Sequence, residues 1–120
     1  MSGKFLISLT HGLDNTDKAT VAFVIANASV ASDKETIVFL SIEGTRLAQL
    51  GVADAVHEEG FAPLKELMDN FAAAGGKMFV CSPCFKKRKL DEDKLVAGAM
   101  IVGGAKLVEF MSDGCPSVSY

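Results

Sequence analysis

The sequence predicts one α/β domain over residues 1–120, in which helices cover both faces of an open, mainly parallel sheet of about five strands. Three observations support this three-layer α/β/α arrangement. Short apolar runs alternate with longer segments of helical composition, glycines punctuate the chain at regular intervals, and the apolar runs are continuous. Continuous rather than alternating hydrophobicity is typical of strands that are covered on both faces, as in a parallel sheet.

The short apolar runs are the expected strands, and they occupy residues 4–10, 36–42, 77–82, 99–103 and 117–120. Helices are expected between them at residues 14–32, 63–76 and 104–114. The first of these opens with candidate N-caps, the second has Pro63 in its first turn, and the third ends on Gly114. A further helix should begin at Ser82, because Pro83 suits a first helical turn.

Residues 43–62 are the least regular part of the chain. They predict one short helix followed by an irregular loop, and long loops in small domains are often lids or contact surfaces.

The helix expected at residues 14–32 has almost no polar face. A helix that is apolar all round is buried on all sides, and a sheet covers only one of them. A second subunit or the loop within residues 43–62 must supply the remaining cover. We expect a homo-oligomer, a trimer or a hexamer.

Composition excludes several classes of protein. Hydrophobic residues make up 49% of the chain and charged residues 22%, which excludes a disordered chain. The net charge of -3 gives no electrostatic reason to expect nucleic acid as a partner. The longest apolar stretch, residues 21–31, is too short for a membrane span. Three cysteines without a repeating spacing suggest the reducing cytoplasm.

Three segments are expected to meet at one edge of the sheet. In an open parallel sheet, ligands bind beyond the carboxyl ends of the strands. The first three expected strands are followed by "THGLDN", "EGTR" and "CSPC". The residues that we expect to bind a ligand there are His11, Gly12, Asp14, Glu43, Gly44, Ser82 and Arg88, and the expected catalytic residues are Cys81 and Cys84.

The two cysteines of "CSPC" differ in their expected positions. Cys81 should lie at a helix N-terminus, where the unpaired N–H groups and the helix dipole favour an anion. The four basic residues 86–89 add positive charge nearby. Both effects lower the pKa of a thiol, so Cys81 is expected to be the reactive thiolate. Cys84, one turn further on, is either a resolving thiol or a residue packed inward.

Neither a metal site nor a cofactor is expected. A structural zinc site needs four ligands. "CSPC" offers two, Cys115 a third and His11 or His57 a fourth, but the chain has no second C-x-x-C and no paired H-x-x-x-H. Cys115, which precedes Pro116, is better explained as a turn or core residue. Phosphate-binding glycine motifs are also absent from the sequence.

The assembled pattern resembles the DsrE/DsrF-like family of small α/β proteins, many of which act in sulfur transfer. The resemblance rests on "GLDNTDKATVAFVIANA", "FLSIEGTRLA", "KELMDNFAAAGGKMFVCSPCFKKRKL" and "LVAGAMIVGGAKLVEFM". It implies a three-layer fold, trimers or hexamers, and a cysteine after the third strand that carries a persulfide or exchanges thiols. Cys81 matches that cysteine, and Cys84 matches a second one found in some relatives. Arg88 and Lys89 stand where the family often has Arg-Gly.

The functional hypothesis is therefore a persulfide carrier or thiol-exchange protein that uses Cys81, with a sulfur donor or acceptor protein as its partner. A true peroxidase is not supported, because P-x-x-x-T-x-x-C is missing. The alternative is a non-catalytic oligomeric module that binds a small anion at the same edge of the sheet.

Overall fold

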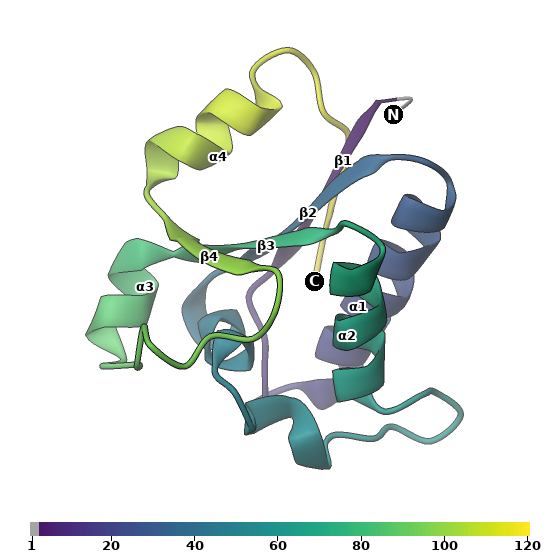
Figure 1. Ribbon diagram of the computed structural model, residues 1–120, viewed down its shortest axis with the longest axis vertical. Helices are drawn as coiled ribbons and strands as arrows, with labels where there is room; N and C mark the ends of the chain where they lie inside the picture. Colours follow the sequence, from purple (N-terminus) through teal and green to yellow (C-terminus); the bar gives the residue numbers. More distant parts are fainter. Residues whose placement is uncertain (1–2) are drawn as a thin grey trace.

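Five parallel strands form one sheet in the order β4-β3-β2-β1-β5. The computed structural model describes residues 3–120, and Figure 1 shows the strands crossing its centre. The strands are β1 (Lys4–Leu9), β2 (Glu35–Leu40), β3 (Lys77–Cys81), β4 (Ala99–Val102) and β5 (Ser117–Ser119). The predicted three-layer α/β fold is confirmed, and each strand lies within one or two residues of its predicted bounds.

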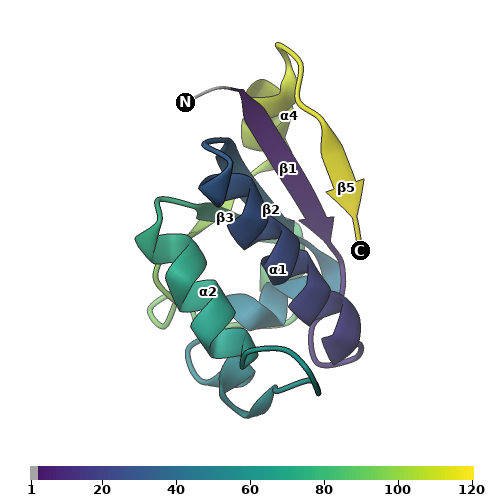
Figure 2. The ribbon, with the colours of Figure 1, turned by 90° about the vertical axis from the view of Figure 1, so that its right-hand side faces the viewer.

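Helices cover the two faces of the sheet unequally. The longer helices α1 (Thr16–Ala31) and α2 (Leu64–Ala73) lie side by side on one face, as Figure 2 shows. The other face carries α4 (Gly104–Met111). The short helix α3 (Ser82–Lys87) follows β3 directly and lies at the carboxyl end of the sheet. Within residues 3–120, no helix is both long and apolar enough to cross a membrane.

Two hydrophobic cores explain why the strands are apolar without alternation. Ile7 and Val38 belong to the larger core beneath α1 and α2. Their sequence neighbours Leu6 and Ile37 belong to a smaller core beneath α4. Successive side chains of a strand point to opposite faces, so a sheet covered on both faces needs apolar residues at both positions.

The first helix begins at Thr16, two residues later than the sequence predicted. Asn15 is its N-cap, and the side-chain oxygen of Asn15 accepts a hydrogen bond of 3.1 Å from the N–H of Lys18. One flank of α1 is covered by α2, and the Asn27 amide donates to the Leu67 carbonyl over 2.9 Å. The hydroxyl of Thr16 also donates to Glu58, in the loop before α2, over 2.6 Å.

Residues 43–62 differ from the prediction of one short helix and a loop. Two 3-10 helices lie in this segment, η1 (Ile42–Ala48), which begins one residue before it, and η2 (Val52–Ala55). A loop then leads to α2. Gly51 separates the two helices in the left-handed conformation, with φ at 91°. The segment packs onto the larger core through Leu47, Ala48 and Ala53. The segment therefore connects β2 to α2 and also helps α1 and α2 to cover one face of the sheet.

Candidate functional site

The carboxyl ends of β1, β2 and β3 lie next to one another, because these strands are neighbours in the sheet. The segments that follow them are the loop into α1, η1 and α3. We call the group formed by Ile42, Glu43, Cys81, Cys84 and Arg88 the thiol site. It joins η1 to α3 at this edge of the sheet.

The two cysteines of the thiol site lie at the start of α3. Cys81 is the N-cap of α3, and Pro83 lies in the first turn, as the sequence predicted. The backbone N–H of Cys84 and the Cys84 thiol both interact with the Cys81 sulfur. Both side chains are half-buried, and neither cysteine forms a disulfide. The arrangement places two free thiols in contact at the start of a helix.

The acidity of Cys81 contradicts the prediction from the sequence. Burial raises the pKa of the Cys81 thiol, and its hydrogen bond with Cys84 raises it further. The N–H of Cys84 and the charge of Arg88 act in the opposite direction but do not compensate. The prediction that the helix N-terminus and basic residues lower the pKa of Cys81 is therefore wrong, because desolvation outweighs both effects.

Cys84 is the more acidic thiol of the pair. Burial raises its pKa, but this effect is outweighed by hydrogen bonds from the Cys81 thiol and the backbone N–H of Ile42. The positive charges of Arg88 and Lys87 add to the lowering, so the pKa of Cys84 falls below that of an ordinary cysteine. The two thiols interact and therefore titrate as a pair, and the groups around Cys84 favour its charged form.

Ile42 has an unusual backbone conformation. Its φ is 54°, a left-handed value that is uncommon for any residue with a side chain and especially for a β-branched one. The hydroxyl of Thr45, which is fully buried, donates to the Ile42 carbonyl over 2.7 Å and holds the turn. Residues with such strain often cluster at functional sites. No feature of the sequence identified Ile42, since β-branched residues disfavour this conformation.

Glu43 binds two arginines at once. Its Oε2 accepts a hydrogen bond of 2.8 Å from Nε of Arg88, and its Oε1 accepts one of 2.8 Å from Nε of Arg46. These bonds hold the pKa of Glu43 below its usual value, with Arg88 the larger cause. Arg88 also donates to the Cys84 carbonyl over 3.2 Å. Arg46 was missed by the sequence reading, although its spacing of three from Glu43 was a usable signal.

Gly12 and Gly44 lie where two backbones approach closely. A Cβ on Gly12 would lie 2.7 Å from the Glu43 carbonyl oxygen, and one on Gly44 would collide with the Leu9 carbonyl oxygen. The N–H of Gly44 donates to the Thr10 carbonyl over 3.2 Å. These contacts bring the loop after β1 against η1 and give both glycines a packing role.

His11 and Asp14 pair with each other within the loop after β1. Nδ1 of His11 lies 2.9 Å from Asp14 Oδ2, and the N–H of Gly12 donates to Asp14 Oδ1 over 2.8 Å. The Gly12 N–H and the His11 ring both lower the pKa of Asp14. The hydrogen bonds of this pair stay inside the loop. Ser82, also predicted as a site residue, is the first residue of α3.

Cys115 lies apart from the other two cysteines in the fold. It precedes β5 and packs, half-buried, against the smaller core. Burial raises the pKa of its thiol. Among the described residues, no group of three or more His, Cys, Asp or Glu side chains is placed to hold a metal ion.

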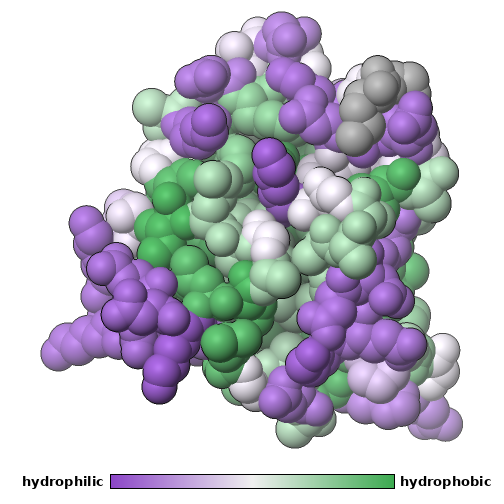
Figure 3. Space-filling model, in the orientation of Figure 1, coloured by the Kyte–Doolittle hydropathy of each residue, from purple (hydrophilic) through white to green (hydrophobic). Residues whose placement is uncertain are grey.

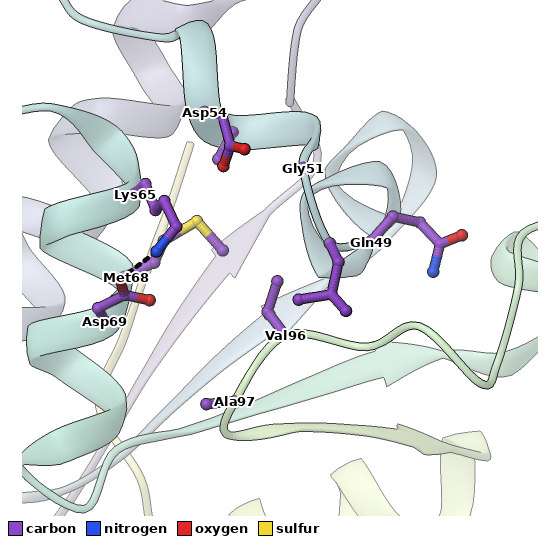
Figure 4. A pocket seen from close by; sticks show the side chains of 10 residues that line it. Gln49, Gly51, Asp54, Lys65, Met68, Asp69, Val96 and Ala97 are labelled. Carbon is purple, nitrogen blue, oxygen red and sulfur yellow. Dashed lines mark hydrogen bonds and ion pairs between the residues drawn. The ribbon is translucent and has the colours of Figure 1, made fainter.

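The surface of α3 is basic, with Lys86, Lys87 and Lys89 exposed, and a hollow is formed by other elements. Figure 3 shows hydrophilic side chains gathered where α3 lies in Figure 1, beside a band of apolar side chains. A hollow of about 200 Å³ is lined by residues of η2, α2 and residues 96–97, among them Met68 and the ion pair of Lys65 and Asp69, which is 2.6 Å long (Figure 4). None of the predicted site residues lines this hollow.

Known structures share the whole architecture. The ychN protein from E. coli superposes with a TM-score of 0.69 at 13% identity, covering 98% of this chain and 99% of that one. The protein MTH1491 from Methanobacterium thermoautotrophicum, of unknown function, gives a TM-score of 0.71 at 14% identity and covers 99% and 100%. At this level of identity the likeness concerns the fold.

Sequence comparison identifies the family. The chain is 29% identical over 108 residues to the uncharacterized protein MJ0760 of Methanocaldococcus jannaschii, which covers 90% of this chain but 39% of that protein's length. The sequence pattern of the DsrE/DsrF-like family matches residues 3–116, nearly the entire chain. The chain therefore belongs to the DsrE/DsrF-like family.

Proposed function

We propose that this protein transfers sulfur or exchanges thiols through the Cys81–Cys84 pair, with Cys84 as the attacking thiolate. The observation that carries the proposal is the pair of free, half-buried thiols at the end of β3, with the guanidinium group of Arg88 bonded to the Cys84 carbonyl. The charge of Arg88 is among the causes that lower the pKa of Cys84. The thiolate is the reactive form of cysteine, and its formation near neutral pH is what a nucleophilic role requires. Membership of a family that includes sulfur-transfer proteins supports the same reading.

The first step is attack by the Cys84 thiolate on the terminal sulfur of a donor persulfide, R–S–SH. A bond forms between this sulfur and Cys84, the S–S bond of the donor breaks, and the donor leaves as a thiolate. The departing thiolate takes the proton of the transferred sulfur, so the protein carries a Cys84 persulfide anion. The backbone N–H of Ile42 and the charge of Arg88 both favour negative charge on the Cys84 side chain.

The second step has two routes. An acceptor thiolate can attack the terminal sulfur and remove it, which restores the Cys84 thiolate. Alternatively, the Cys81 thiol loses its proton and attacks the inner sulfur of Cys84, forming a Cys81–Cys84 disulfide and releasing hydrosulfide, which carries the proton. In this route the two thiols are oxidised and the transferred sulfur is reduced. A dithiol reductant must then open the disulfide.

The wild-type protein is expected to gain about 32 Da, one sulfur atom, when treated with a persulfide donor. Intact-mass spectrometry at neutral pH measures the adduct, and a dithiol such as dithiothreitol should remove it. With time, a disulfide-linked form about 2 Da lighter than the reduced protein should replace the adduct. A wild-type protein that never gains sulfur and never forms the disulfide would contradict the proposal.

The alternative of an anion-binding module has less support from the same edge of the sheet. The carboxylate of Glu43 already holds the guanidinium groups of Arg46 and Arg88. His11 is paired with Asp14 in the same way. An external anion would therefore have to displace the Glu43 carboxylate from Arg46 and Arg88, or the Asp14 carboxylate from His11.

The proposed chemistry also bears on the cellular location of the protein and on its partners. Two free thiols persist in a reducing compartment, which supports the cytoplasm as the location. The donor and acceptor are proposed to be proteins or small thiols that reach the exposed basic surface of α3. The overall charge of -3 gives no support for nucleic acid as a partner.

We further propose a trimer or hexamer, with the free flank of α1 as part of the interface. Hollows remain beside Ile25 and Val21 on this flank, one of them lined also by Phe5 and the other by Tyr120. Light scattering should give a mass several times the 12.7 kDa of one chain. Ile25→Glu should shift the protein toward the monomer, because an unpaired charge opposes burial.

Val108→Glu is the matched control for this experiment. Val108 lies on α4 and is 67% exposed, so the same charge there should leave the mass unchanged. A clean monomer for the wild-type protein at micromolar concentration would show that the α1 flank is simply solvent-exposed.

A further inference from the structure

We propose that Glu43 is a positioning residue of the thiol site: by binding Arg46 and Arg88 together, it ties η1, which begins at Ile42, to α3, which carries Cys84. We call the bonds of Glu43 to Arg46 and Arg88 the clamp. Its role in catalysis rests on the proposed function, but its effect on the pKa of Cys84 can be tested without a sulfur donor. Glu43 acts through its neighbours, since its two carboxylate oxygens are bonded to guanidinium groups.

The clamp connects two elements that carry the reacting groups. Glu43 directly follows Ile42 at the start of η1, whereas Arg88 ends α3, and 45 positions separate Glu43 from Arg88. The guanidinium of Arg88 binds both the Glu43 carboxylate and the Cys84 carbonyl. A rigid path of two hydrogen bonds therefore leads from Cys84 to the residue next to Ile42.

Burial strengthens this connection. The Arg88 side chain is only 11% exposed, so its charge is largely removed from water and needs a partner. Glu43 is that partner, and its own side chain is 32% exposed. The planar guanidinium group also fixes the direction of its hydrogen bonds, which a lysine would not do.

The conformation of Ile42 explains why a clamp is needed. A left-handed φ of 54° at a β-branched residue persists only when surrounding contacts impose it. The Thr45 hydroxyl fixes the Ile42 carbonyl, and the N–H of Gly44 is fixed by the Ser41 and Thr10 carbonyls. Glu43 adds the contact that ties this turn to α3. This turn carries the backbone N–H of Ile42, which is among the groups that lower the pKa of Cys84.

A test can separate positioning from simple charge, because the two effects have opposite signs. Removing a carboxylate near a thiol should by itself lower the thiol pKa, since one negative charge is lost. Losing the Ile42 hydrogen bond and the placement of Arg88 should raise it. The other titratable groups that act on Cys84 are Cys81, at the end of β3, and Lys87, on α3.

The experiment measures alkylation of Cys84 by iodoacetamide against pH, with peptide mapping to exclude Cys115. A Cys81→Ser background leaves one thiol at the site and keeps a hydroxyl as donor. In this background, Glu43→Gln and Glu43→Ala are expected to raise the midpoint pH. The alkylation rate at pH 7 should then fall, on the order of three- to tenfold, with the larger fall for Glu43→Ala.

Asp69→Asn is the matched control, because it removes a carboxylate from the ion pair with Lys65 within α2. It should leave the midpoint pH of Cys84 unchanged. Circular dichroism confirms that each variant is folded, and Glu43→Gln, which keeps the shape of the side chain, supplies the result if Glu43→Ala does not fold.

A midpoint that stays constant or falls in folded Glu43→Gln would overturn the proposal, and so would an equal rise in Asp69→Asn. Neither result depends on sulfur transfer, since alkylation needs no persulfide donor. A wild-type protein that fails to accept sulfur would contradict the proposed function and leave the positioning role of Glu43 measurable.

Discussion

Replacing Cys84 with serine is expected to abolish the gain of one sulfur atom from a persulfide donor. The Ile42 N–H and the charges of Arg88 and Lys87 lower the pKa of Cys84, which is why we propose it as the attacking thiolate. A serine hydroxyl ionises far too weakly to replace it. In contrast, Cys81→Ser should keep the adduct and lengthen its life, because the thiol that closes the disulfide is gone.

Intact-mass spectrometry of both variants over time measures these outcomes. Cys115→Ser is the control, since this cysteine packs against the smaller core and should not alter the adduct. If Cys81→Ser loses the adduct while Cys84→Ser keeps it, then Cys81 is the nucleophile, as the sequence alone suggested. A reductase assay on the wild type should show thiol-exchange activity that depends on both cysteines.

Replacing Gly44 with alanine is expected to lower the free energy of unfolding by about 3 kcal/mol, at the upper end of overpacking effects. The added Cβ would collide with the backbone carbonyl oxygen of Leu9. A backbone atom at the end of a central strand cannot move aside as a flexible side chain can. The start of η1 must therefore shift away from β1.

Urea denaturation of the variant and the wild type measures this loss. Gly104→Ala is the matched control, because a Cβ there meets no atom within 4 Å and alanine favours the helix α4 that begins at this position. It should be neutral or slightly stabilising. Equal stability of Gly44→Ala and the wild type would mean that η1 can move freely from the end of β1.

The sequence was sufficient to place the thiols but not to rank their acidity. Apolar runs and the position of Pro83 located Cys81 at the end of a strand and at a helix start. Local rules then favoured Cys81, since dipole and charge effects can be read from neighbouring residues. Burial depends on the whole fold, and it reversed the result by raising the pKa of Cys81.

Contacts between segments that are distant in the chain could not be predicted from the sequence either. Glu43 and Arg88 were both predicted at the site, but their ion pair joins residues 45 positions apart and consumes the charges that we expected a ligand to meet. The two 3-10 helices of residues 42–55 were not predicted, because their short hydrogen-bonded turns leave no long hydrophobic period. Strand order likewise depends on packing of the elements.

The uneven cover of the sheet affects how the molecule opens. The helix α4 has no fully buried residue, and β5 pairs with β1 over only three residues. The ion pair that fastens this part, Lys4 with Asp113 at 2.9 Å, is largely exposed on the Asp113 side. Proteins open in cooperative units of unequal free energy. We therefore expect residues 104–120 to open at a lower free energy than β1, β2 and β3, while these strands and α3 hold the thiols in place.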